Sequence, residues 1–116
     1  MNDTAHSPCV NACNLCAAAC SHCARACLEE PDVAALARCI GLDLDCAAVC
    51  QLTAAAMARG SELGPVLCEF CASICERCAA ECARHEHDHC QSCASMCRRC
   101  AVSCREAADA GADTLA

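Results

Sequence analysis

The sequence predicts an all-α protein, an antiparallel up-down-up-down four-helix bundle with a cysteine-lined interior. The 19 cysteines among 116 residues fall in four segments and are spaced by three or four positions, or by the sum of the two. This spacing keeps a side chain on one stripe of an α-helix, whereas a strand would need steps of two. The connections between the segments are short, which favours antiparallel neighbours in a bundle over a helical solenoid.

The four helices are expected at about residues 7–28, 32–59, 65–84 and 88–110, all within one domain covering residues 1–116. Ser7 suits the N-cap of the first helix, and Pro8 its first helical position. The sequence "EEPD" separates the first two helices, "GSELGP" the next two, and "HEHDH" the last two. The fourth helix should stop near Gly111, because glycine commonly follows the last helical residue.

Each expected helix carries its cysteines on one inward stripe, and no cysteine falls outside the four stripes. The stripes consist of Cys9, Cys13, Cys16, Cys20, Cys23 and Cys27; Cys39, Cys46 and Cys50; Cys68, Cys71, Cys75, Cys78 and Cys82; and Cys90, Cys93, Cys97, Cys100 and Cys104. The second stripe also includes Leu36, Asp43, Thr53 and Met57. The second helix should therefore contribute less to metal binding than the others.

Composition excludes several classes of partner. The formal net charge of −7 argues against nucleic acid, which is bound through basic surfaces. No run of about 18 apolar residues could span a bilayer, so we expect no membrane partner. The polar opening, residues 1–8, lacks the basic and apolar regions of a secretory signal, which predicts a cytoplasmic location.

Three roles for so many cysteines can be compared. As small hydrophobes they would bury less apolar surface than leucine and would remain open to oxidation. As disulfides, pairs three or four apart on one helix would have nearly parallel Cβ vectors and would close only short loops. Metal binding by thiolates is therefore the favoured role of the cysteines. No group of residues in the sequence resembles a catalytic site, so we do not expect the protein to be an enzyme.

Charge favours Cu(I) as the metal. Zinc at four thiolates per ion would leave excess negative charge buried in the bundle, whereas one monovalent ion per thiolate leaves none. Soft sulfur donors also select Cu(I). The sequence has eight C-x-x-x-C pairs and six C-x-x-C steps, so sulfur should run continuously along the interior. A zinc- or cadmium-sequestering thiolate protein, and a thiol redox or structural protein, remain the alternatives.

The C-x-x-x-C pairs, the four stripes and the histidines near the third connection resemble the bacterial copper storage proteins. The resemblance covers Cys9 to Cys104. It implies reversible storage of many Cu(I) ions for copper supply and detoxification, assembly into a homotetramer, and exchange with copper chaperones or other copper donors and acceptors. Because it lacks an export signal, the chain resembles the cytosolic branch of that family.

Three histidines and one aspartate are further candidate metal ligands. His85, His87 and His89 lie in a connection expected at the same end of the bundle as Cys27 and Cys90, where they would assist copper entry; the alternative is an ordinary charged turn. Asp43 occupies a stripe position, where an unpaired carboxylate would be costly to bury. It either ligates metal or pairs with a histidine.

An alternative placement of Asp43 is also open. The second helix could turn locally so that Leu42 is buried and Asp43 lies near water. Met57, at the other end of the same stripe, is expected to be ordinary core rather than a thioether ligand.

Overall fold

The computed structural model describes residues 7–115 and confirms the all-α four-helix bundle. Its elements are α1 (Ser7–Leu28), the short 3-10 helix η1 (Val33–Leu36), α2 (Ala37–Ala58), α3 (Gly64–Ala83) and α4 (Asp88–Leu115). Residues 1–6, which include most of the polar opening, lie outside the described residues. No helix within residues 7–115 is both long enough and apolar enough to cross a membrane.

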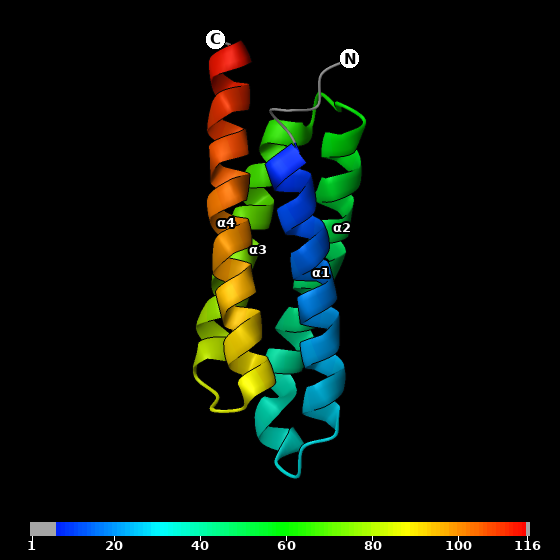
Figure 1. The fold of residues 1–116 in the computed structure, drawn as a ribbon, viewed down its shortest axis with the longest axis vertical. Helices are drawn as coiled ribbons and strands as arrows, with labels where there is room; N and C mark the ends of the chain where they lie inside the picture. Colours follow the sequence, from blue (N-terminus) through cyan, green and yellow to red (C-terminus); the bar gives the residue numbers. More distant parts are fainter. Residues whose placement is uncertain (1–6, 116) are drawn as a thin grey trace.

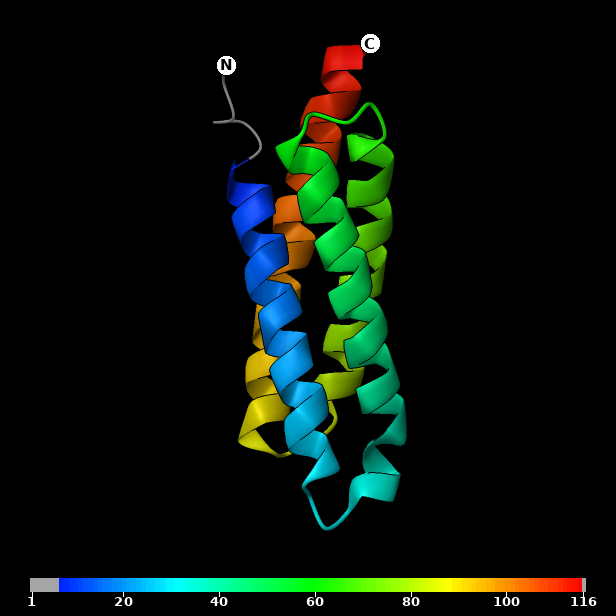
Figure 2. The same cartoon turned by 90° about the vertical axis from the view of Figure 1, so that its right-hand side faces the viewer.

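The helices alternate in direction around a ring (Figure 1). The start of α1, the end of α4 and the α2–α3 connection lie at one end, which we call the terminal end. The connection from α1 to α2 and that from α3 to α4, residues 29–36 and 84–87, lie at the other, which we call the histidine end. Figure 2 shows from the side that α1 and α2 run next to each other over their full lengths.

Small side chains let the four helices approach closely. Each helix packs against two neighbours, with α1 against α2 and α3 against α4 forming the most extensive contacts. Alanines flank the cysteine stripes and are buried at these contacts: Ala17 and Ala24 on α1, Ala47 and Ala54 on α2, Ala72 and Ala79 on α3, and Ala94 and Ala101 on α4. Alanine also has the highest helix propensity, so the same residues favour the helices and their packing.

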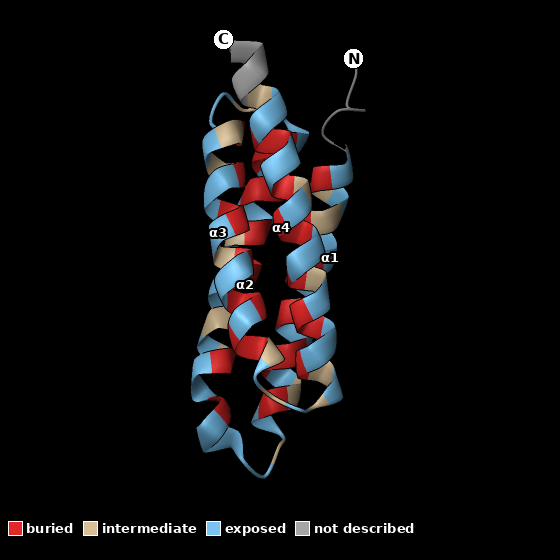
Figure 3. Cartoon of the chain, turned by 90° about the vertical axis from the view of Figure 1, so that its left-hand side faces the viewer, coloured by how far each residue is buried: buried red, intermediate tan, exposed pale blue. Residues whose placement is uncertain are grey.

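Burial follows the stripes. All 19 cysteines are buried, none more than 2% exposed. In Figure 3 the buried positions form bands along the inner faces of the helices, and the outer faces are exposed. The interior therefore consists mainly of sulfur, with little of the leucine and isoleucine of an ordinary bundle core.

The α2–α3 connection begins with a glycine that the backbone requires. Gly60 has φ of 67°, in the left-handed region where glycine is unstrained. Its N–H donates to the carbonyl of Met57 at 3.2 Å, and the N–H of Ser61 donates to that of Ala56 at 2.9 Å. These are the two hydrogen bonds of a Schellman motif, and they end α2.

Two expected helix boundaries are wrong. The second helix does not begin as an α-helix at residue 32, because a tighter 3-10 turn comes first. In it the N–H of Ala35 donates to the carbonyl of Asp32 at 2.9 Å, and Leu36 is fully buried. The fourth helix continues past Gly111 to Leu115. A Cβ at Gly111 would lie 2.5 Å from Cγ of Pro65, so this glycine allows a close approach to α3 instead of ending α4.

Candidate metal centre

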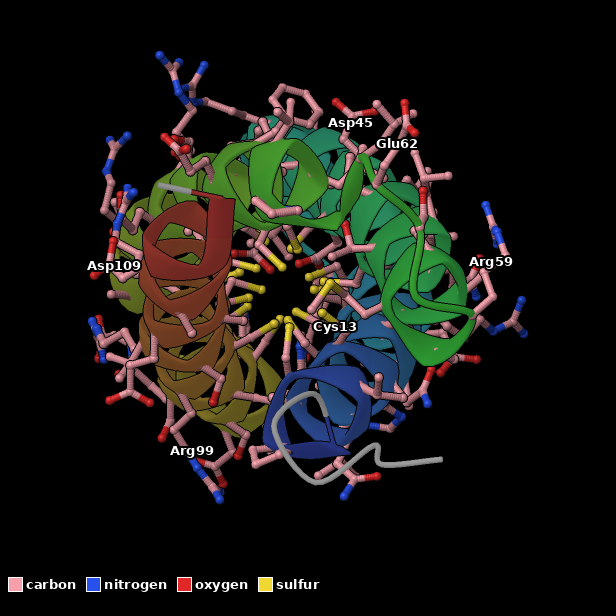
Figure 4. All side chains as sticks on the ribbon, turned by 90° about the horizontal axis from the view of Figure 1, so that it is seen from above. Cys13, Asp45, Arg59, Glu62, Arg99 and Asp109 are labelled. Atoms are coloured by element: carbon pink, nitrogen blue, oxygen red, sulfur yellow. The ribbon has the colours of Figure 1, made fainter. Side chains whose placement is uncertain are left out.

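The lumen of the bundle is lined with sulfur. Figure 4, a view along the axis, shows Cys13 pointing inward among the other sulfur atoms, whereas the charged side chains of Asp45, Arg59 and Arg99 point outward. All the cysteines are free thiols. The helical period explains the arrangement, because residues three and four apart share one face of a helix and four such faces meet at the axis.

The sulfur atoms form overlapping groups of four along the lumen. In each group every Sγ lies within 4.8 Å of the others. From the histidine end, five such groups are Cys23, Cys27, Cys39 and Cys90; Cys20, Cys78, Cys93 and Cys97; Cys16, Cys20, Cys46 and Cys97; Cys16, Cys46, Cys50 and Cys75; and Cys13, Cys71, Cys100 and Cys104. Beyond them, Sγ of Cys9 lies 3.7 Å from that of Cys68 and 3.8 Å from that of Cys104.

Adjacent groups are close enough to share ions. Sγ of Cys50 lies 3.7 Å from Sγ of Cys71 and 3.9 Å from Sγ of Cys100, which joins two groups near the terminal end. At the histidine end Sγ of Cys39 and of Cys82 are 3.4 Å apart. Two sulfurs on opposite sides of one ion would be roughly 4.6 Å apart if the metal–sulfur bond is about 2.3 Å, as for zinc. Small side-chain movements would therefore admit metal ions anywhere along the lumen.

Burial favours the neutral thiol before metal binds, as at Cys27 and Cys90. Burial raises the pKa of Cys27 to about 11, and burial likewise raises the pKa of Cys90 well above its ordinary value. A buried thiolate without a cation nearby would be costly, so the proton stays on sulfur. Each ion that binds must therefore displace thiol protons, and a monovalent ion that displaces one proton leaves the lumen neutral.

Asp43 lies inside the lumen among thiols. Its side chain is fully buried, and its Oδ1 accepts hydrogen bonds from Cys78 at 3.2 Å, Cys93 at 3.3 Å and Cys82 at 3.4 Å. Oδ2 also accepts from Cys39 at 3.9 Å. Burial raises the pKa of Asp43 to about 8, so the carboxyl is mostly protonated at neutral pH.

Two of the expectations for Asp43, pairing with a histidine and a position near water, are wrong. Leu42 is only half-buried, so α2 does not turn to place it inside. Within residues 8–111, the partners of the Asp43 carboxyl oxygens are cysteines and not a histidine. The carboxyl therefore takes the place of a cysteine on the α2 stripe.

The structure separates the three histidines. Nδ1 of His89 lies 3.6 Å from Sγ of Cys90, 3.7 Å from that of Cys23 and 3.8 Å from that of Cys27. Its Nε2–H donates to Oε2 of Glu30 at 2.9 Å, which leaves the Nδ1 lone pair facing the thiols. A carboxylate behind a histidine in this way fixes the ring and makes it a better metal ligand.

The other two histidines are held by carboxylates. Nε2 of His87 lies 3.2 Å from Oδ1 of Asp32, and its ring stacks on that of His89 with the centroids 5.3 Å apart. Nε2 of His85 lies 2.8 Å from Oε2 of Glu81. Within residues 8–111, His89 is the one histidine whose ring nitrogen contacts cysteine sulfur.

Two further residues of the α2 stripe, Thr53 and Met57, lie at the terminal end of the lumen. Thr53 is fully buried, and its hydroxyl donates to the carbonyl of Val49 at 2.8 Å. Met57 is 5% exposed and packs on α3, where a Cβ at Gly64 would lie 2.7 Å from its Sδ. These contacts are those of core residues and close the terminal end. At the histidine end the side chain of His89 is partly exposed.

Comparison with known proteins identifies the family. The family model described as copper storage protein matches residues 2–109. The chain belongs to the copper storage protein family. This family is defined by storage of a metal and not by catalysis, and the resemblance found in the cysteine pattern is confirmed.

Two solved copper storage proteins have the same fold. One, from Streptomyces lividans, is described as a cytosolic copper storage protein with five coppers; it is 42% identical, with a TM-score of 0.89 over 92% of this chain and 94% of that one. A Cu(I)-bound copper storage protein, Csp3 of Bacillus subtilis, is 45% identical, with a TM-score of 0.87 over 90% of this chain and 99% of that one. An uncharacterised cysteine-rich protein of B. subtilis, YhjQ, is 47% identical over 70% of this chain and 75% of its own length.

The carboxylates behind the histidines were not anticipated from the sequence. Glu81, near the end of α3, lies four residues before His85. This spacing places two side chains on the same face of a helix, so the pair could have been predicted from the sequence. Glu30 and Asp32 belong to the α1–α2 connection, whereas His87 lies in the α3–α4 connection and His89 in the first turn of α4. No local pattern relates them, and only the packing of the two connections brings them together.

Proposed function

We propose that the protein stores many Cu(I) ions reversibly on the cysteine thiolates of its lumen, for copper supply and detoxification. The observation that carries the proposal is the continuous set of 19 buried thiols in contact with one another. Soft thiolates favour Cu(I), and a one-for-one exchange of thiol protons for monovalent ions keeps the interior uncharged. The copper-loaded relatives from S. lividans and B. subtilis support this choice of metal.

The proposed ligands are the nineteen cysteines, with histidine and aspartate in accessory roles. His89 would receive copper at the histidine end, since its Nδ1 lone pair already faces Cys23, Cys27 and Cys90. His85 and His87 would act beside it at the same opening. Asp43 would supply an oxygen ligand where α2 lacks a cysteine.

Location and assembly are proposed from the relatives and the surface. The S. lividans relative is described as cytosolic, and we assign the same compartment to this chain. Leu15, Leu44, Leu52 and Phe70 are each at least 50% exposed, and their outward apolar surface would be covered in the homotetramer that the family resemblance implies. Copper chaperones or other copper donors and acceptors would be its partners. Sedimentation of a 12.0 kDa monomer alone at micromolar concentration would contradict the assembly.

Competition between metals tests the function. The reduced protein, held under anaerobic conditions, would be offered Cu(I) and Zn(II) together and its metal content measured after gel filtration. Storage of Cu(I) predicts that copper excludes zinc from the lumen. Retention of a few zinc ions in preference to copper would support a zinc- or cadmium-sequestering protein, and rapid formation of stable intrahelical disulfides in air would support a redox role.

A further inference from the structure

A groove on the outer surface between α2 and α3 gathers positive charge on an acidic protein. Its volume is about 320 Å³, and it is lined by Arg38, Arg77, Ala80, Glu81 and Arg84. Three of the chain's eight basic residues thus lie together, although the formal net charge is −7. With three guanidinium groups and one carboxylate, the groove has an excess of two positive charges.

A buried carboxylate holds two of these arginines in place. The Glu81 side chain is only 6% exposed, and its Oε1 accepts from Nε of Arg38 at 3.1 Å and from an Nη of Arg84 at 3.2 Å. The hydrogen bond from His85, helped by the charge of Arg84 and a hydrogen bond from Arg38, lowers the pKa of Glu81, so this carboxylate stays ionised. The guanidinium groups are therefore positioned before any ligand arrives.

The third arginine is free to bind an anion. Within residues 8–111, no carboxylate lies within ion-pair distance of Arg77. A second groove, of about 400 Å³ between α3 and α4, differs in this respect. It contains Arg98 and Arg105 but also Glu76, Glu106 and Asp109, and Arg105 is paired with Glu76 at 2.8 Å. Of the two grooves, the one at Arg77 is suited to an anion.

The groove lies directly outside the thiols at the histidine end. Arg38 precedes Cys39 and Glu81 precedes Cys82, and the two sulfur atoms meet at 3.4 Å on the lumen side. Arg84 immediately precedes His85 in the connection to α4. A ligand in the groove would therefore lie on the outer side of the same turns of α2 and α3 whose inner side carries Cys39 and Cys82.

We propose that this groove binds the carboxylates of a small thiol that carries Cu(I) as an anionic complex. Arginine is suited to carboxylates because its planar guanidinium donates two parallel hydrogen bonds. The inference rests on the proposed storage of Cu(I). In the transfer, the bond from copper to the donor sulfur breaks as a bond to a cysteine Sγ of the protein forms. The proton of that cysteine passes to the released donor thiolate, and copper remains Cu(I) throughout.

Direct binding is tested without copper. S-methylglutathione, which has two carboxylates and no free thiol, would be titrated into the ¹⁵N-labelled apo protein while the arginine Nε resonances are followed. We expect shifts at Arg77 and Arg84 in the wild type; the shift at Arg84 should weaken in Arg77→Gln and stay unchanged in Arg99→Gln. Arg99 is an exposed arginine outside both grooves, so the two variants change the net charge equally. No shift at these arginines, or equal shifts with inorganic phosphate, would overturn the proposal.

Loading kinetics test the consequence for copper. We expect Arg77→Gln to slow loading from Cu(I)–glutathione by about threefold to fivefold at low salt, from the loss of one charge near the ligand. Loading from Cu(I)–acetonitrile, which has no carboxylate, and the total capacity should not change. An equal effect on both donors would overturn the role in delivery. If the protein stored no Cu(I) at all, S-methylglutathione binding would still test the groove separately.

Discussion

Replacing Asp43 with asparagine should stabilise the metal-free protein at neutral pH. Asp43 is fully buried, and burial raises its pKa from 3.8 to about 8. In the unfolded chain the carboxyl is ionised at pH 7, whereas in the fold it is protonated. Folding therefore takes up a proton, and the contribution of Asp43 to stability is present below pH 4 and is lost as the pH rises towards 8.

The magnitude follows from the size of that pKa shift. Between 3.8 and pH 7 the cost grows by about 1.4 kcal/mol per pH unit, which amounts to about 4 kcal/mol at pH 7. Asparagine keeps the shape and the accepting oxygen but does not ionise. Its amide N–H groups would find only sulfur acceptors, at a cost of about 1 kcal/mol. The net gain should be about 3 kcal/mol at pH 7 and close to zero at pH 4.

Chemical unfolding of the reduced apo protein measures this difference. Guanidinium chloride titrations of wild type and Asp43→Asn, at the same protein concentration between pH 4 and 8, should diverge as the pH rises. Asp45→Asn is the matched control, because Asp45 lies on the same helix, is exposed, and loses the same charge. A difference between wild type and Asp43→Asn that stays constant across this pH range would refute the assignment of a buried, protonated carboxyl.

Three further predictions concern loading and folding. Replacing His85, His87 and His89 together with alanine should slow Cu(I) uptake but leave capacity almost unchanged, with most of the effect in His89→Ala and little in His87→Ala, because only His89 contacts sulfur within residues 8–111; in stopped-flow loading, an unchanged rate or a large loss of capacity would refute this. Cu(I) loading at neutral pH should release about one proton per ion, because burial disfavours a thiolate without a cation, as at Cys27 and Cys90; a pH-indicator titration with no proton release would contradict it. The apo protein should be helical by far-UV circular dichroism, because neutral thiols and alanine already pack the interior; a coil spectrum that becomes helical only with copper would show that metal drives folding.

The fold could be predicted from the sequence because the cysteine spacing is strictly helical. A cysteine every three or four residues specifies both the helix and the face that must be buried, and short connections leave an antiparallel ring as the simplest arrangement. The same register placed Asp43 on the inward stripe, while a local turn of α2 that would bury Leu42 instead was left open. Helix boundaries were less predictable. The 3-10 turn before α2 depends on the burial of Leu36, and the role of Gly111 within α4 depends on its close approach to Pro65.

The inward positions of the cysteines were predicted from the sequence, but the carboxylates that contact the histidines were not. Each cysteine position is fixed by helical phase, which is local information. The orientation of the His89 ring depends on Glu30, which reaches His89 from the α1–α2 connection, 59 residues away in sequence. A contact between residues so far apart in the sequence leaves no periodic pattern, so it can be found only in the folded structure.

The capacity of the lumen tests the central claim most directly. The fully reduced protein would be titrated with Cu(I) in an anaerobic chamber, with a chromogenic Cu(I) chelator reporting the point at which free copper appears. One ion per thiolate predicts saturation at roughly 15 to 20 Cu(I) per chain, with no cysteine left reactive towards a thiol reagent. Saturation at about five ions or fewer, with most thiols still reactive, would contradict storage by the whole lumen.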